Sequence, residues 1–254
     1  MSQHADIKAA VAAAFSAAAD TYDDGAEVQR EVAERLALRI ARLPLPPRAR
    51  ILEIGCGTGF LTRALARIDA RELVITDIAP AMLARCRINV RDAAPETAVE
   101  FLVMDGEDPR VEGPFDLICA SLAFQWFADL PASLARLAGL LAPGGHLAFA
   151  TLAADSFCEW RAAHSAAGLY AAMHNYPPRA ALSNMLPEIA ISEDRLHRRY
   201  ADGIAFLDHL KQIGAHMPED NRRLGPGALR SVLRGFAGGI DVTYHVAYGT
   251  WSRR

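Results

Sequence analysis

The segment from Arg50 to Asp77 constrains the fold of this chain most, because its pattern is that of a strand, a glycine loop, a helix and a second strand. The apolar run before the loop is typical of a buried parallel strand. Gly55, Gly57 and Gly59 follow at GxGxG spacing, which lets the backbone approach a bound molecule closely. The second strand ends at Asp77, where a carboxylate can accept hydrogen bonds from two ribose hydroxyls. The segment therefore predicts a nucleotide-type ligand at the carboxyl ends of parallel strands.

Glu53 narrows the class of ligand. It lies two residues before the first glycine, and the loop is GxGxG rather than the GxGxxG of dinucleotide-binding proteins. A carboxylate at this position repels a pyrophosphate but suits a cationic ligand; a structural anchor for the loop amides is an equally good interpretation. The stretch resembles motif I of the class I S-adenosylmethionine (SAM) methyltransferases. That resemblance implies SAM as the cofactor and S-adenosylhomocysteine as its product.

The rest of the chain continues the alternation of strands and helices. Strand candidates end at Asp105 and Ser121, and a further one, His146–Thr151, follows a turn at Pro143–Gly145. This alternation predicts an α/β fold with a Rossmann-like, doubly wound parallel sheet. The resemblance adds that the sheet has seven strands, with the last one inserted antiparallel.

We expect a single methyltransferase domain over residues 1–254. Residues 1–47 would form an N-terminal helical lid and residues 48–154 the SAM-binding core. Prolines interrupt the helical pattern of residues 155–190, which we interpret as a helical cap insertion. Residues 191–254 would supply the remaining core strands and helices.

Composition argues against several other classes. The net charge of −3 disfavours general nucleic-acid binding, which needs a basic surface. No apolar run reaches the ~18 residues of a membrane span. The four cysteines are far apart and lack the spacing of a zinc site, so we predict free thiols and no metal. No secretory signal is evident, and a cytoplasmic protein is expected.

Ligands of such sheets bind outside the carboxyl ends of the strands. By resemblance to the family, Asp77 takes the ribose hydroxyls, and Asp105 meets the adenine amino edge with the backbone of Gly106 and Glu107. The same resemblance places Gly55 and Ser121 near the methionine portion. The full predicted cofactor set is Glu53, Gly55, Gly57, Gly59, Asp77, Ile78, Asp105, Gly106, Glu107 and Ser121.

The run SLAFQWFADL, residues 121–130, narrows the family. Gln125 and Trp126 follow a strand end, where the reacting methyl group would be presented. The run resembles a segment shared by the malonyl-acyl-carrier protein O-methyltransferases of biotin synthesis (BioC) and the trans-aconitate methyltransferases. The N-terminal pattern with Tyr22 and Gln29, the LKQIGAH run from Leu210 and the TYHVAYG run from Thr243 resemble the former family.

This resemblance implies methyl transfer from SAM to the free carboxylate of a malonyl thioester, carried by acyl-carrier protein or coenzyme A. Such a carboxylate is already ionised at pH 7 and needs no general base. We name Tyr22, Gln125 and Trp126 as the candidates for catalysis. An arginine on the cap would bind the acceptor carboxylate through its guanidinium fork. The candidates for this role are Arg179, Arg195, Arg198 and Arg199.

Two alternatives stay open at this point. One is a carboxyl methyltransferase of a small free acid such as trans-aconitate. The other is a SAM-binding assembly factor of a respiratory complex that transfers no methyl group. The sequence leaves the oligomeric state undetermined.

Overall fold

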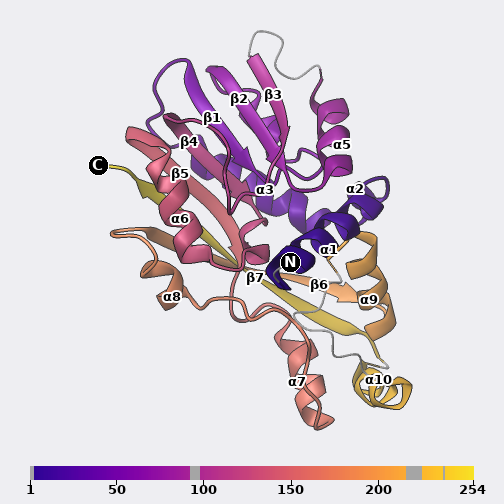
Figure 1. Cartoon of the computed structure of the whole chain (residues 1–254). Coiled ribbons are helices and arrows are strands. Elements are labelled where there is room, and N and C mark those ends of the chain that lie inside the picture. Colours follow the sequence, from indigo (N-terminus) through magenta and orange to yellow (C-terminus); the bar gives the residue numbers. More distant parts are fainter. Residues whose placement is uncertain (1–2, 92–97, 216–224, 237) are drawn as a thin grey trace.

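The computed structural model describes residues 3–91, 98–215, 225–236 and 238–254, which contain a seven-stranded sheet (Figure 1). The strand order is β3-β2-β1-β4-β5-β7-β6, with β7 antiparallel to both of its neighbours. The predicted doubly wound α/β sheet with an antiparallel last strand is confirmed. The strands are β1 (Ala49–Ile54), β2 (Ala70–Asp77), β3 (Ala98–Val103), β4 (Phe115–Ser121), β5 (Leu141–Leu152), β6 (Ala190–Tyr200) and β7 (Ile240–Ser252).

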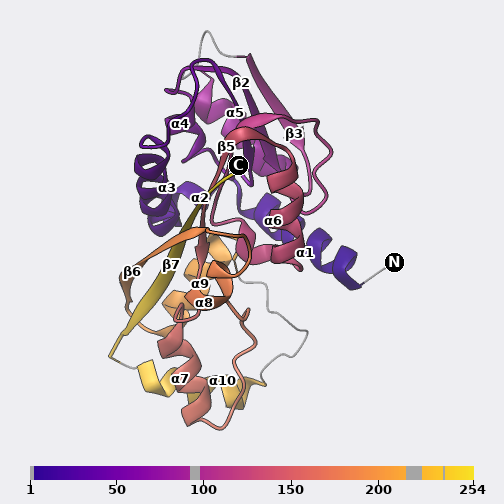
Figure 2. The same cartoon turned by 90° about the vertical axis from the view of Figure 1, so that its left-hand side faces the viewer.

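Helices cover both faces of the sheet, because successive side chains of a strand point to opposite sides. In β1, Ile51 packs in the cluster that includes α3, whereas Leu52 packs in the cluster that includes α6. Figure 2 shows α3 and α6 on opposite sides of the sheet. The helices are α1 (Gln3–Ala18), α2 (Tyr22–Gly25), α3 (Glu27–Ile40), α4 (Thr62–Leu65), α5 (Pro80–Val90), η1 (Phe124–Trp126), α6 (Leu130–Gly139), α7 (Cys158–Ala166), α8 (Arg179–Ser183), α9 (Gly203–Gln212), α10 (Pro226–Leu233) and η2 (Arg234–Phe236).

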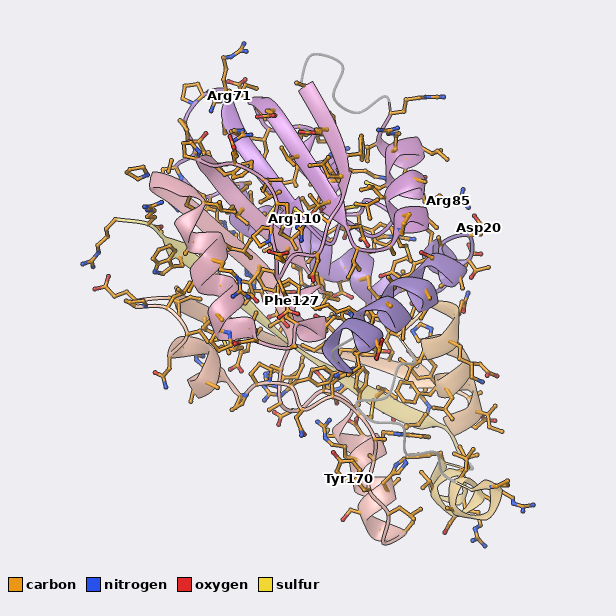
Figure 3. All side chains as sticks on the ribbon, in the orientation of Figure 1. Asp20, Arg71, Arg85, Arg110, Phe127 and Tyr170 are labelled. Atoms are coloured by element: carbon orange, nitrogen blue, oxygen red, sulfur yellow. The ribbon has the colours of Figure 1, made fainter. Side chains whose placement is uncertain are left out.

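The end of α1 is fixed to α5. Arg85 of α5 donates a hydrogen bond to Asp20 at 2.8 Å, and the two side chains lie close together in Figure 3. Beside this ion pair, Ala19 packs against Ala79 and Met82 in a small buried cluster. These contacts hold the N-terminal helix beside the end of β2, where Asp77 lies.

The fifth strand begins earlier than its sequence predicts. The turn predicted at Pro143–Gly145 lies within β5, whose pairing with β4 shifts register between Leu141 and His146. The backbone N–H of Gly144 donates to Arg253, and that of Arg253 donates to Gly145. The glycines still make a sharp bend, with Gly144 at φ +76°, but hydrogen bonds to the chain beyond β7 keep the bend in the sheet.

Residues 155–190 are less helical than predicted. They contain α7 and α8, but residues 167–178 between these helices form neither helix nor strand. Pro177 and Pro178 end this stretch and allow a helix to begin only at Arg179. Among the described residues, no helix has the length and apolar character required to cross a membrane.

Candidate active site

A first cavity lies at the carboxyl ends of β1, β2 and β4, as expected for ligands of a parallel sheet. Most of the sequence-predicted residues meet there. Those lining it are Tyr22, Glu53, Gly55, Gly57, Asp77, Ile78, Asp105, Gly106, Glu107, Ser121 and Trp126. Gly59 does not line the cavity, because its α-carbon faces α5. A Cβ there would lie 3.0 Å from Cys86 Sγ, so this glycine permits helix packing.

The glycine loop and Asp77 hold each other in place. Gly57 has a left-handed backbone, with φ +55°, and its N–H donates to Asp77 Oδ2 at 2.8 Å. The N–H of Ala79 donates to the other carboxylate oxygen, also at 2.8 Å. Burial raises the pKa of Asp77 to about 6, although these backbone donors favour its ionised form. The carboxylate is thus oriented toward the cavity by the loop itself.

Glu53 is almost completely buried, with 1% of its surface exposed. Its carboxylate accepts a hydrogen bond at 2.7 Å from the hydroxyl of Thr62, at the start of α4. Burial, together with the charge of Asp77, raises the pKa of Glu53 to about 8 despite that bond. The side-chain partner of Glu53 in this structure is therefore the Thr62 hydroxyl, and a cation in the cavity would favour its ionised form.

Lys8 is a cavity residue that the sequence analysis missed. Its ammonium lies 2.5 Å from Asp105 and 2.8 Å from Glu107. Burial opposes the charge of Lys8, but the hydrogen bonds to these two carboxylates outweigh it and raise the lysine pKa. Lys8, Val11 and Phe15 line the cavity at helical spacing, so one face of α1 forms its wall. The signal in the sequence was an isolated lysine in an alanine-rich helix, in a chain with two lysines in all.

A second cavity of about 390 Å³ adjoins the first. Its walls are largely aromatic and aliphatic, with Phe157, Trp160, Tyr176 and Tyr244 prominent among them. Five residues line both cavities and form what we call the junction: Phe15, Tyr22, Gln29, Leu122 and Trp126. The rings of Phe15 and Trp126 meet edge to face with centroids 5.4 Å apart. The junction joins the ends of α1 and β4 to α3.

The candidates for catalysis divide between the cavities. Tyr22 and Trp126 belong to the junction and line both cavities, whereas Gln125 lines the second cavity but not the first. Burial and the charges of Asp77 and Asp23 raise the pKa of Tyr22, so its hydroxyl remains protonated.

Gln125 is held by bonds within the protein. Its amide nitrogen donates to the carbonyl of Leu122 at 2.6 Å, and its amide oxygen accepts from Thr151 at 3.5 Å. Leu122 has φ +51°, a left-handed conformation that is uncommon for leucine. Gln125 therefore supports the backbone of a junction residue.

The four candidate arginines line neither of these cavities. Arg195 pairs with Asp155 at 2.6 Å and Arg198 with Glu31 at 2.5 Å. The other two are similarly engaged, Arg199 with Asp241 at 2.6 Å and Arg179 with Glu193 at 3.6 Å. The structure does not bring them to these cavities, because three of them on β6 and Arg179 on α8 are paired with acidic neighbours. Within the described ranges, no group of His, Cys, Asp or Glu side chains could hold a metal ion.

Comparisons with known proteins agree with this geometry. A family model described as a methyltransferase domain matches residues 51–145. The chain is 50% identical over 96% of its length to the biotin biosynthesis bifunctional protein BioCD of Bordetella avium, of which it spans 52%. It is 43% identical to the malonyl-acyl-carrier protein O-methyltransferase of Magnetococcus marinus, over 91% of this chain and 88% of that protein. The fold is shared with the solved DhpI–SAM–HEP complex, at a TM-score of 0.60, 16% identity and 99% coverage of both chains. The chain belongs to the family of the malonyl-acyl-carrier protein O-methyltransferases.

Proposed function

We propose that this protein transfers the methyl group of SAM to the free carboxylate of a malonyl group carried by acyl-carrier protein. The products are the malonyl methyl ester and S-adenosylhomocysteine. The observation that carries this proposal is the junction, which joins an acidic cavity with a glycine loop to a cavity lined without carboxylates. The choice of malonyl-acyl-carrier protein as the acceptor is supported by the relatives, which are named as O-methyltransferases of this substrate.

The first cavity suits SAM, which is a cation with a ribose. Four carboxylates line the cavity, and Glu53, Asp77 and Glu107 among them are buried. Asp77 would hold the ribose hydroxyls, and Asp105 with Gly106 and Glu107 the adenine edge. A Cβ added at Gly55 would lie 2.5 Å from the Cβ of Ala123, so a side chain does not fit at this position. The loop therefore lines the cavity with its backbone there.

SAM supplies an electrophilic methyl group on its sulfonium. The acceptor carboxylate is ionised at neutral pH, so the protein has to position it and exclude water rather than remove a proton. The rings of Phe15 and Trp126 give the junction an apolar wall, and Tyr22 of the junction carries a protonated hydroxyl that can donate a hydrogen bond. A desolvated carboxylate is the better nucleophile, which an aromatic wall favours.

We also propose that residues 1–47 act as a lid, because α1 and α3 supply Lys8, Phe15 and Gln29 to the cavity walls. The segment 155–190 would act as the acceptor cap, since Phe157, Trp160 and Tyr176 line the second cavity. The cysteines of the chain are free, as expected in a reducing cytoplasm, where we place the reaction.

Mass spectrometry of malonyl-acyl-carrier protein after incubation with the protein and SAM tests the function. We expect one methyl group to be added, and none to be added to acetyl-acyl-carrier protein, which lacks the free carboxylate. Malonyl-coenzyme A and trans-aconitate are tested in parallel. Methylation of aconitate but not of either malonyl thioester would contradict the proposal and favour a small-acid enzyme.

A further inference from the structure

The junction contains a half-buried polar side chain whose amide oxygen has no hydrogen-bond partner among the described residues. Gln29 of α3 lines both cavities, and its amide oxygen is buried without a hydrogen bond to any described residue. Its helix neighbours Val28, Val32 and Ala33 are packed in the apolar core. A buried amide oxygen without a partner is destabilising, and a ligand that hydrogen-bonds to this side chain would offset that cost.

Cations are scarce in these walls. Among the described lining residues of the two cavities, Lys8 and Lys211 are the lysines and there is no arginine; His164 and His174 also line the second cavity. Lys8 is engaged by Asp105 and Glu107, and Lys211 pairs with Asp208 at 3.0 Å on an exposed face. The five junction residues, by contrast, are an amide, a phenol and apolar side chains.

A neutral site suits this chemistry. Transfer of a methyl cation to a carboxylate removes two opposite charges, so the acceptor is most negative before the reaction. A fixed guanidinium would stabilise that ground state more than the transition state and would slow the step. Neutral hydrogen-bond donors orient the carboxylate with a smaller penalty.

We propose that the side-chain amide of Gln29 binds the acceptor carboxylate at the junction, together with the hydroxyl of Tyr22, in place of an arginine. The amide can rotate to present its NH₂ group, because its two ends are close in size. The uncharged pantetheine part of the acceptor, next to the thioester, then occupies the second cavity. This inference rests on the proposed methylation of a malonyl thioester.

The test compares wild-type protein with Gln29→Leu, which keeps the bulk and removes the hydrogen bonds. We expect kcat/KM for malonyl-acyl-carrier protein to fall about 10- to 100-fold, as for loss of a hydrogen bond to a charged group. Calorimetric affinity for S-adenosylhomocysteine should stay within about twofold, which also reports that the variant is folded. Glu34→Gln, a change at an exposed position further along α3, should behave as wild type.

Gln29→Glu gives a second readout. A carboxylate at this position repels the acceptor, so activity should fall further than in Gln29→Leu and recover partly at lower pH, where the glutamate takes up a proton. A wild-type kcat/KM in Gln29→Leu would overturn the inference and leave the proposed function intact. An equal loss of S-adenosylhomocysteine affinity would also overturn it, by assigning Gln29 to the cofactor site. If the wild-type protein does not methylate the malonyl thioester, the proposed function fails first.

Discussion

The two cavities of this protein differ in charge although they share five wall residues. The first is lined by the carboxylates of Glu53, Asp77, Asp105 and Glu107. The described lining of the second contains no aspartate or glutamate. An acidic cavity attracts a sulfonium, and a cavity without carboxylates admits an anionic acceptor without repulsion. Under the proposed function, each cavity is matched to the charge of one reactant, and the two reactants meet at the junction.

Removing Asp77, the proposed ligand of the ribose, should have the largest effect. Asp77→Ala deletes the side chain that accepts from Gly57 and Ala79, so both the ligand contact and the loop conformation are lost. We expect SAM affinity, measured by calorimetry, to fall at least about 100-fold. Asp108→Ala, an exposed carboxylate near the same cavity, is the matched control. Unchanged SAM affinity in Asp77→Ala would contradict the proposed contact between Asp77 and the ribose.

Tyr22→Phe separates positioning from cofactor binding. Loss of the hydroxyl at the junction should lower kcat about 10- to 100-fold, with SAM affinity nearly unchanged. Tyr170→Phe, which alters an exposed tyrosine beyond α7 (Figure 3), is the control. Wild-type kinetics in Tyr22→Phe would reduce this tyrosine to a packing role.

Proton linkage at Glu53 should make cofactor affinity depend on pH. Because its pKa is raised to about 8 in the free protein, the carboxyl is protonated at pH 6 to 7 and must lose a proton when a cation binds. SAM affinity should therefore rise with pH toward 8, by at most about tenfold per pH unit. Glu53→Gln should flatten this dependence in calorimetric titrations. A slope that persists in the variant would assign the proton to another group.

The raised pKa of Glu53 also makes the stability of the fold depend on pH. Unfolded Glu53 ionises near its ordinary pKa, while the folded carboxyl holds its proton until about pH 8. Its contribution to the free energy of unfolding is therefore largest at acidic pH and declines as pH rises toward 8.

A carboxylate introduced into the second cavity should remove the charge difference between the two cavities and hinder binding of the acceptor. Met173→Glu puts a negative charge on the wall that the acceptor passes, and Met173→Gln is the neutral control of similar size. We expect KM for malonyl-acyl-carrier protein to rise about tenfold in the glutamate variant, and less at high salt. SAM affinity should not change. Equal KM values in the two variants would show that the acceptor avoids this cavity.

The smallest effect is expected at Lys8. Its ion pairs with Asp105 and Glu107 are partly exposed, and such pairs contribute modestly. Lys8→Gln should weaken SAM binding by a few-fold, about two to five, and reduce its salt dependence. Lys211→Gln is the control, since it changes the other lysine of the chain. Tighter binding in Lys8→Gln would mean that the lysine competes with the cofactor for Asp105.

The first cavity could be predicted from sequence because its residues follow strand ends. Asp77, Asp105 and Ser121 lie where β2, β3 and β4 finish, so their meeting follows from the sheet alone. The second cavity could not be predicted in this way. Its walls come from α3, η1, α7, α9 and β7, whose mutual placement depends on side-chain packing rather than on a repeating pattern.

The positions of the four candidate arginines could not be predicted from their residue type. A carboxylate acceptor suggested an arginine partner, yet Arg195 and Arg198 lie on β6 beside Asp155 and Glu31. The junction is enclosed by packing between distant segments, which favours neutral groups there, and amino-acid composition does not predict such a location. Gln29 was visible in the N-terminal pattern, but only the structure shows its amide oxygen buried between two cavities.

The most direct measurement is a crystal structure with S-adenosylhomocysteine and a malonyl-pantetheine analogue whose thioester cannot be hydrolysed. We predict that the nucleoside occupies the first cavity and the pantetheine arm the second. The malonyl carboxylate should lie at the junction, within hydrogen-bonding distance of Gln29. A carboxylate held instead by Arg179, Arg195, Arg198 or Arg199, with the arm outside the second cavity, would contradict the account.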